Sequence, residues 1–372
     1  MAERIAVITL HRTANYGSVL QALATQTVLE RMGYEVEVVD YYPERSTIKS
    51  MLRGLKEKKT IFKKNPLALV AARAIILPSY LKRRRTFDVF IERELNLTNR
   101  TYWTEDELKS GCPQADIYIT GSDQVWNSVW NGGIDEILFL SWTPETARRL
   151  AFSASFGKAS LDEAEKDRTR ELLSRYEHIT VREDSGVEIV RSLGLDATQV
   201  LDPTLFLTAE DWLSRCSAVI PEGDYILMYN INHNKPLDRF VSALSDKTSL
   251  PVYYISYQLH DCFKRGHMRC CVPVEDFLAL IRGARYVVCD SFHCAAFSVN
   301  FNRELAIVMP DRFGTRLASF MRVVGLEDRI VPEDGIDVFD RPIDWDAVNA
   351  CLMAERKRSI GVVQGMLSRG ED

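Results

Sequence analysis

A segment of ten residues, RYVVCDSFHC at positions 285–294, combines a strand pattern with side chains that could bind an anion and move a proton. Tyr286 to Cys289 predict a short strand, and a helical pattern follows its polar tip. In open α/β sheets, ligands bind where a strand turns into a helix, because free N–H groups there attract anions. A histidine can move a proton near neutral pH, so His293 at this tip is a candidate acid or base. The alternative is that His293 caps the helix and bonds to a backbone carbonyl.

Three arginines also lie where a predicted strand turns into a helix. Arg182 directly follows the predicted strand 178–181, where a guanidinium suits a carboxylate or phosphate ligand. Its alternative role is an ion pair with Glu183 or Asp184. Arg312 and Arg316 flank a glycine at a further strand-to-helix turn, and a solvated helix start is the alternative for them.

Polar residues also follow the predicted strand 117–120. Asp123 is a candidate base or acceptor for a sugar hydroxyl, with a turn or a helix cap as the alternative. Gln124 and Trp126 beside it suit sugar binding because aromatic faces stack on pyranose rings, although a tryptophan here could equally belong to the core.

The first predicted helix is preceded by a turn of small residues. Gly17 would let the backbone approach a ligand, and Asn15 and Ser18 could bind it or simply cap the helix. The turn is not a GxGxxG fingerprint, so we expect no nicotinamide cofactor.

The elements that must position these residues alternate between strand and helix along most of the chain. Such alternation predicts parallel sheets with right-handed crossovers. Two series of elements indicate two doubly wound domains facing each other across a cleft. We place an N-terminal domain at residues 1–207, a C-terminal domain at 208–343 and a final helix within 344–372, with its helical pattern from Trp345 to Leu367. The predicted strands are 5–10, 36–41, 117–120, 150–156, 178–181, 200–201, 225–231, 252–256, 286–289 and 305–309.

Composition excludes several classes of protein. The 372 residues are 46% hydrophobic and 27% charged with a net charge of −5, which is typical of a globular protein and gives no reason to expect nucleic-acid binding. No run of 18 apolar residues predicts a transmembrane helix. The eight cysteines are scattered without a CxxC pair, which favours reduced thiols and a cytoplasmic location. No grouping of His, Cys and carboxylates has the spacing of a metal site.

The segment from about residue 45 to 93 is predicted to be a basic helical insertion in the first domain. Its clusters, which end in the run Lys82–Arg85, flank an apolar piece from Leu67 to Leu77. Such a segment could contact an anionic membrane surface, near a polyprenyl-diphosphate-linked sugar. The alternative is a solvated helical hairpin.

Four segments together resemble the polysaccharide pyruvyltransferase family: Asn15–Gln21 (NYGSVLQ), Gly121–Asn127 (GSDQVWN), Val181–Gly186 (VREDSG) and Asp290–Cys294 (DSFHC). The phrases Val200–Leu205 and Gly325–Arg329 also fit. The resemblance implies two Rossmann-like domains in a GT-B-like arrangement. It further implies transfer of pyruvate from phosphoenolpyruvate to a sugar of a capsule, exopolysaccharide or cell-wall polymer, as a ketal and without a cofactor.

For this reaction His293 and Asp123 are the catalytic candidates, and Arg182, to which the resemblance also points, Ser291 and Phe292 are among the substrate-binding candidates. Ser291 stands where other branches of the family have an arginine that contacts the donor, so another arginine, such as Arg316, is a candidate replacement. Two other classes of function stay open. One is a GT-B glycosyltransferase that uses a nucleotide sugar, and the other is a non-catalytic partner in polysaccharide assembly.

Overall fold

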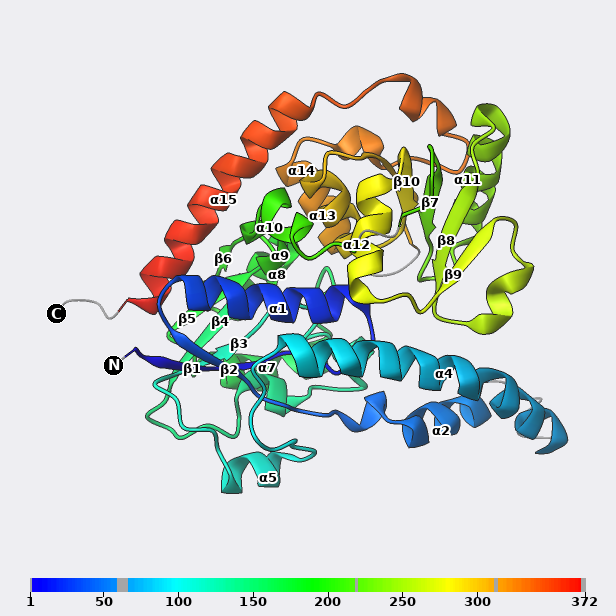
Figure 1. The fold of residues 1–372 in the computed structure, drawn as a ribbon. Helices are drawn as coiled ribbons and strands as arrows, with labels where there is room; N and C mark the ends of the chain where they lie inside the picture. The colour runs from blue at the N-terminus through cyan, green and yellow to red at the C-terminus, as the bar shows by residue number, and fades with distance from the viewer. Residues whose placement is uncertain (1, 59–65, 218–219, 311–313, 369–372) are drawn as a thin grey trace.

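The computed structural model describes residues 2–58, 66–217, 220–310 and 314–368. The chain forms two parallel sheets with helices packed around them (Figure 1). Arg312, one of the predicted anion-binding candidates, lies outside the described residues.

The first sheet has six parallel strands in the order β2-β1-β3-β4-β5-β6. Helices cover both sides of a parallel sheet, so its inner strands are buried on both faces. Strand β3 illustrates this, since all four of its residues are buried. The strands are β1 (Arg4–Ile8), β2 (Glu35–Val38), β3 (Ile117–Thr120), β4 (Arg148–Ala154), β5 (His178–Val181) and β6 (Thr198–Gln199).

The second sheet has five parallel strands in the order β11-β10-β7-β8-β9. The strand that precedes His293 lies second in this order and is hydrogen-bonded to a neighbour on each side. The strands are β7 (Ile226–Tyr229), β8 (Val252–Ser256), β9 (His267–Cys270), β10 (Tyr286–Cys289) and β11 (Glu304–Ile307).

Helices connect the strands of each sheet and meet at the boundary between the two halves. Those of the first half are α1 (Tyr16–Arg31), α2 (Ile48–Lys58), α4 (Pro66–Glu94), α5 (Glu105–Ser110), α6 (Ser128–Asn131), α7 (Glu163–Leu173), α8 (Asp184–Ser192), α9 (Pro203–Phe206) and α10 (Ala209–Leu213). Those of the second half are α11 (Lys235–Thr248), α12 (Val274–Gly283), α13 (Phe292–Asn300), α14 (Thr315–Val323) and α15 (Trp345–Leu367).

One hydrophobic core spans both halves. Tyr16 of α1 stacks on Phe277 of α12 with ring centroids 4.4 Å apart, and Trp212 packs edge-on against Phe297 of α13. The last helix α15 returns to the first half, where the Ser359 hydroxyl accepts a hydrogen bond from the amide of Leu201. These contacts fix how the strand ends of the two sheets face each other.

Two helices of the basic segment extend from the body side by side (Figure 1). Helix α4 is anchored by its second half, where Phe87 and Ile91 are buried. Its N-terminal half reaches beyond the two sheets. Pro78 lies inside this helix, so the apolar piece that was expected to end there continues as one element.

Several predicted strands, such as 5–10 and 36–41, extend two or three residues beyond the observed β1 and β2, and two other predictions differ more. Strand β9 was missed because HMRC has no apolar run, which is a pattern typical of an edge strand. The strand predicted at 200–201 instead occupies Thr198–Gln199. The positions of the domain boundaries remain predictions.

Candidate active site

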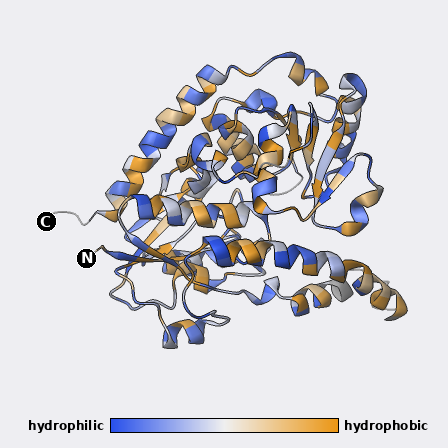
Figure 2. Cartoon of the chain, viewed as in Figure 1, coloured by the Kyte–Doolittle hydropathy of each residue, from blue (hydrophilic) through white to orange (hydrophobic). Residues whose placement is uncertain are grey.

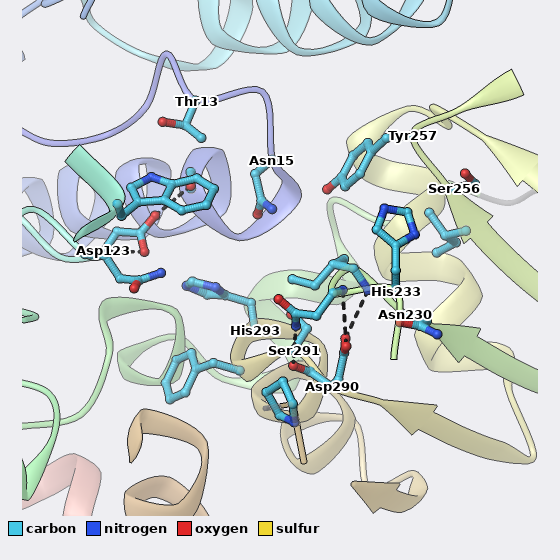
Figure 3. A pocket seen from close by; sticks show the side chains of 18 of the residues that line it. Thr13, Asn15, Asp123, Asn230, His233, Ser256, Tyr257, Asp290, Ser291 and His293 are labelled. Carbon is cyan, nitrogen blue, oxygen red and sulfur yellow. Dashed lines mark hydrogen bonds between the residues drawn. The ribbon is translucent and has the colours of Figure 1, made fainter. Parts of the chain in front are cut away.

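A cavity of about 470 Å³ lies between the two halves. Its walls come from the carboxyl ends of β1 and β3 on one side and of β7, β8 and β10 on the other (Figure 3). This is where ligands of parallel α/β sheets bind. Eight of the predicted site residues line it: Asn15, Ser18, Asp123, Gln124, Ser291, Phe292, His293 and Arg316.

His293 is the second residue of α13 and points toward the first half of the chain (Figure 3). Its ring packs directly on Gly17, where a Cβ would lie 2.0 Å from Nδ1. The Nε2 atom lies 3.6 Å from an oxygen of Asp202 and has no hydrogen-bond partner among the described residues. With an exposed fraction of 6%, the imidazole is held tightly but still reaches the cavity.

Below the cavity floor lies a cluster of buried charges. The guanidinium of Arg182 donates to Asp202 over 2.6 Å and to Asp123 over 3.2 Å, and lies 3.9 Å from Glu183. Burial raises the pKa of Asp202, but the charges of His293 and Arg182 and several hydrogen bonds outweigh burial and hold that pKa well below its ordinary value. The carboxylate is therefore ionised at neutral pH, beside the imidazole.

Asp123 lies between this cluster and the cavity. Its φ of 78° is left-handed, a conformation that aspartate tolerates better than most residues. The carboxylate accepts hydrogen bonds from the Ser18 hydroxyl (2.6 Å) and the Gln124 amide (2.8 Å). Burial raises the pKa of Asp123, but the positive charges of Arg182, His293 and Arg316 lower it by more. The net effect is a pKa below the ordinary value. A low pKa suits a hydrogen-bond acceptor for a hydroxyl better than a strong base.

Arg316 is the second residue of α14 and lines the same cavity. Burial, and then repulsion by Arg182, lower its pKa to about 10, so it is still charged at neutral pH. No hydrogen bond or ion pair joins its side chain to another described residue, and its Nε is buried without a partner. The side chain is half-buried, and an unpaired guanidinium whose Nε is shielded from water is stabilised when an anion binds it.

The tip of β10 holds its neighbours in place by polar contacts. Asp290 accepts hydrogen bonds from the backbone amides of Ile231 and Asn232, which fixes the loop after β7. Ser291 is the N-cap of α13, but its side chain does not bond to the helix. Phe292 lies under the guanidinium of Arg182, 4.8 Å from ring centroid to Cζ. The N-terminus of α13 therefore has no side-chain cap at the cavity wall.

Asn15 and Gly17 show that the turn before α1 serves two purposes. The Asn15 side chain accepts from the Gly17 amide and caps the helix. Gly17 makes room for the imidazole of His293 rather than for a ligand. Ser18 bonds to Asp123 and does not cap the helix.

Two predicted substrate contacts need correction. Arg182 does not line the cavity: its side chain is fully buried, so it acts on the site by holding Asp123 and Asp202. Trp126 belongs to the core, because its ring stacks on Phe139 and meets the edge of Tyr176. Trp130, which is 49% exposed and lines the cavity, is available for stacking instead.

Several cavity residues were missed by sequence reasoning. Arg83 on α4 lies 4.0 Å above the ring of Tyr257, which joins the basic segment to the second half. Its position in the run Lys82–Arg85 suggested only a surface charge. The part of the cavity near β7 and β8 is lined by neutral hydrogen-bonding side chains that no sequence motif predicted: Asn230, Asn232, Ser256 and Gln258.

Comparison with solved structures relates the architecture to sugar-processing enzymes. The fold is similar to a putative UDP-N-acetylglucosamine 2-epimerase from Listeria monocytogenes, with a TM-score of 0.51 and 11% identity over 95% of this chain and 91% of that one. It is also similar to S. aureus MnaA in complex with UDP, with a TM-score of 0.50 and 12% identity over 99% and 97% of the two chains. These similarities establish two Rossmann-like domains in a GT-B-like arrangement.

The sequence decides the family. A model of the family described as polysaccharide pyruvyl transferase matches residues 15–311, which includes the turn before α1, Asp123 and the tip of β10. The chain belongs to the polysaccharide pyruvyl transferase family. No curated protein sequence matches it significantly. As a member of this family, the protein is an enzyme that acts on a sugar acceptor.

Among the described residues, no group of three or more His, Cys, Asp and Glu side chains is arranged to hold a metal ion. Likewise, no helix in the described part of the chain is both long and apolar enough to cross a bilayer. The acidic and basic side chains that line the cavity are those of arginines, aspartates and two histidines, His233 and His293.

The buried cluster predicts how acid affects stability. The pKa values of Asp123 and Asp202 are lower in the folded protein than in the unfolded chain, where an aspartate titrates near about 3.9. Their contribution to stability is therefore present above about pH 4 and is lost as the pH falls through the folded values. We expect the free energy of unfolding, measured by chemical denaturation, to decrease steeply below about pH 4.

The variant Asp202→Asn should lower stability at neutral pH by about 3–5 kcal/mol, because it leaves Arg182 without its closest carboxylate. It should also reduce the steepness of the acid loss. Asp196→Asn, at an exposed position, is the control and should change neither quantity. An unchanged acid profile in Asp202→Asn would contradict the assigned role of the cluster.

The contact between Gly17 and His293 predicts a second effect. The methyl group of Gly17→Ala would overlap the imidazole, so the ring must move away from Asp202. We expect turnover to fall by at least about tenfold, which corresponds to 1.4 kcal/mol of transition-state stabilisation. Gly361→Ala on α15, where an added Cβ meets nothing within 4 Å, should leave turnover unchanged. Equal activities of the two variants would show that the position of His293 is unimportant.

Proposed function

We propose that the protein transfers pyruvate from phosphoenolpyruvate to a sugar of a cell-surface polysaccharide or of its lipid-linked precursor. The observation that carries this proposal is the unpaired guanidinium of Arg316 in the cavity that His293 also lines. Phosphoenolpyruvate has two anionic groups, a carboxylate and a phosphate. A guanidinium can form bidentate hydrogen bonds with either group.

The positive groups that face the cavity come from both halves. Arg316 and the N-terminus of α13 belong to the second half, and Arg83 reaches in from α4 of the first. Arg83 donates from Nε to the carbonyl of Ala14, which leaves its terminal nitrogens without a hydrogen-bond partner among the described residues. Arg316 thus takes over the role that an arginine at position 291 has in other branches of the family.

The reaction assigns work to His293 and Asp123. One sugar hydroxyl adds to the enol double bond: its oxygen bonds to C2, and C3 gains a proton. A second hydroxyl then attacks C2, phosphate leaves with the C2–O bond electrons, and the ketal closes. The proton of the first hydroxyl replaces the proton given to C3, and the proton of the second hydroxyl goes to the departing phosphate. We assign delivery of the proton to C3 to His293, because its imidazole lines the cavity together with Asp123 and Arg316. Asp123 accepts the hydrogen bond of the attacking hydroxyl, and Ser18 fixes its orientation.

The acceptor sugar fits the neutral lobe of the cavity. Amide and hydroxyl side chains near the ends of β7 and β8 can both donate and accept hydrogen bonds, as a sugar requires. Trp130 offers an exposed aromatic face, and Gln124 lies next to Asp123. Phosphoenolpyruvate is the only co-substrate that this scheme needs, without cofactor or metal, and the enzyme would work in the cytoplasm, where that metabolite and the polymer precursors are available.

Donor binding can be tested by thermal unfolding. Phosphoenolpyruvate at 100 times its dissociation constant should stabilise the wild type by about 2.7 kcal/mol, because it binds only the folded state. His293→Ala and Arg316→Ala should each reduce this stabilisation strongly. Arg322→Ala on the same helix, at a side chain that is 59% exposed, is the matched control and should retain it.

Nucleotide sugars serve as the competing ligands in the same assay. Stabilisation by UDP- or dTDP-sugars but not by phosphoenolpyruvate would overturn the proposed donor and favour a glycosyltransferase. Failure of every ligand to stabilise the protein would instead favour a non-catalytic role in polysaccharide assembly.

A chelator tests the proposed independence from metals. Arginines and helix N-termini can carry the charge of the leaving phosphate, so pyruvyl transfer should survive treatment with excess EDTA. Turnover should be compared before and after removal of the chelator and again after Mg²⁺ or Mn²⁺ is added. Loss of activity that added metal restores would contradict the scheme.

A further inference from the structure

The outer half of α4 exposes a row of apolar side chains. The exposed fractions are 80% for Leu67, 61% for Val70, 58% for Ile75 and 53% for Leu81. Ala71, Ala74 and Pro78 are exposed between them, at the three- and four-residue spacing of one helix face. The row, hereafter the apolar row, is about 21 Å long at 1.5 Å per residue. Figure 2 shows hydrophobic residues along this end of the helix.

The apolar row is held outward by the opposite face of the same helix. Ser79 is 3% exposed and accepts a hydrogen bond from the amide of Leu259 in the second half. Tyr80 donates to the carbonyl of Ser46, next to α2. Phe87 and Phe90 anchor the helix in the core. The helix cannot turn its apolar row inward without breaking these contacts.

The surroundings of the apolar row are strongly basic. Residues 45–87 contain thirteen Lys and Arg residues and one acid, Glu57, in a chain whose net charge is −5. Lys82 and Arg85 follow the apolar row and are exposed, and Lys49 and Arg53 of α2 are exposed beside it. Arg83 and Arg84 of the basic run face inward, where they donate to the carbonyls of Ala14 and Arg12. Only part of the run predicted to meet a membrane is therefore free to do so.

The charge selects among the possible partners. A second copy of the chain would bring two clusters of like charge together, which is unfavourable. A nucleic acid would complement the charge but offers no apolar surface to the apolar row. An anionic bilayer offers both phosphates and acyl chains, and a helix with an apolar face and flanking basic residues is the type that lies in its interface.

We propose that the apolar row of α4, together with Lys82, Arg85 and the exposed basic residues of α2, docks the protein on an anionic phospholipid surface. The four large apolar side chains enter the boundary between headgroups and acyl chains. The lysines and arginines lie at the lipid phosphates.

Docking at this surface would also define the side from which a lipid-linked acceptor sugar enters the central cavity, an inference that rests on the proposed function. A second cavity of about 340 Å³ lies at the root of the two helices, lined in part by Arg45, Tyr80 and Arg84. It shares Thr13, Arg83 and Trp130 with the central cavity. Leu81, the last residue of the apolar row, precedes Arg83 by about 3 Å along the helix axis. A sugar held at the bilayer by a lipid diphosphate would thus meet arginines on its way to His293.

Vesicle co-sedimentation tests the proposal on the full-length protein. We expect binding to phosphatidylcholine vesicles that contain phosphatidylglycerol and much weaker binding to phosphatidylcholine alone. Binding should decrease as salt rises, because charge attraction is screened. Lys82→Gln with Arg85→Gln should weaken it by about fivefold for each charge removed.

The combined variant Leu67→Ser, Val70→Ser, Ile75→Ser and Leu81→Ser should weaken vesicle binding by more than about tenfold, since each side chain loses most of its transfer into the acyl region. All four positions are exposed, so circular dichroism and thermal unfolding should be unchanged. Met353→Ser, at a residue of α15 that is 67% exposed, is the apolar control, and Arg191→Gln with Arg265→Gln is the charge control. Both controls should bind vesicles as the wild type does.

The proposal would be overturned if the wild type did not bind anionic vesicles, or if the four-serine variant bound them equally well. It would also be overturned if the protein bound duplex DNA but not vesicles, and if Lys82→Gln with Arg85→Gln abolished the DNA binding. Analytical ultracentrifugation that shows a dimer lost in the four-serine variant would assign the apolar row to a second copy instead. Failure of the proposed chemistry is distinguishable, because phosphoenolpyruvate stabilisation and turnover of a soluble sugar do not involve the apolar row and should persist in the four-serine variant.

Discussion

The position of the candidate catalytic groups depends on one buried guanidinium. Arg182 is enclosed by three carboxylates, and a charge removed from water is tolerable only if it is paired and hydrogen-bonded. Each partner comes from a different element. Asp123 follows β3, Glu183 begins α8, and Asp202 caps α9 through the amide and hydroxyl of Thr204. The need to pair this charge therefore brings three strand ends of the first sheet to fixed distances from one another.

The same cluster explains an unfavourable backbone conformation. Asp123 has a positive φ, which costs a non-glycine residue about 1–2 kcal/mol. Its carboxylate bonds to Ser18, Gln124 and Arg182, and these bonds hold the residue in place. Such strain is typical of residues that must present a side chain in one direction. Here the direction is toward the imidazole of His293 and the open volume above it.

The fold could be predicted well from the sequence because parallel strands are buried on both faces and leave short apolar runs. β3, β5 and β10 start and end where those runs do. The edge strand β9 has no such run and was missed. The site was predicted less well. A residue that follows a strand is placed near the cavity by topology, but whether its side chain faces a ligand depends on its partners. Arg182 and Arg316 both follow strands, and two of the three carboxylates around Arg182, those of Asp123 and Asp202, are distant in sequence. Trp126 and Trp130 are four residues apart, and only the packing of Phe139 and Tyr176 separates the core residue from the exposed one.

The contact between Gly17 and His293 joins the two halves of the molecule at the point of chemistry. His293 belongs to the second half, whereas Gly17 and Asp202 belong to the first. The imidazole is thus aligned only while the halves are closed on each other. The alignment of the imidazole therefore depends on the contacts that join the two halves. A substitution in this shared core, far from the cavity, would change the site through the relative position of the two sheets.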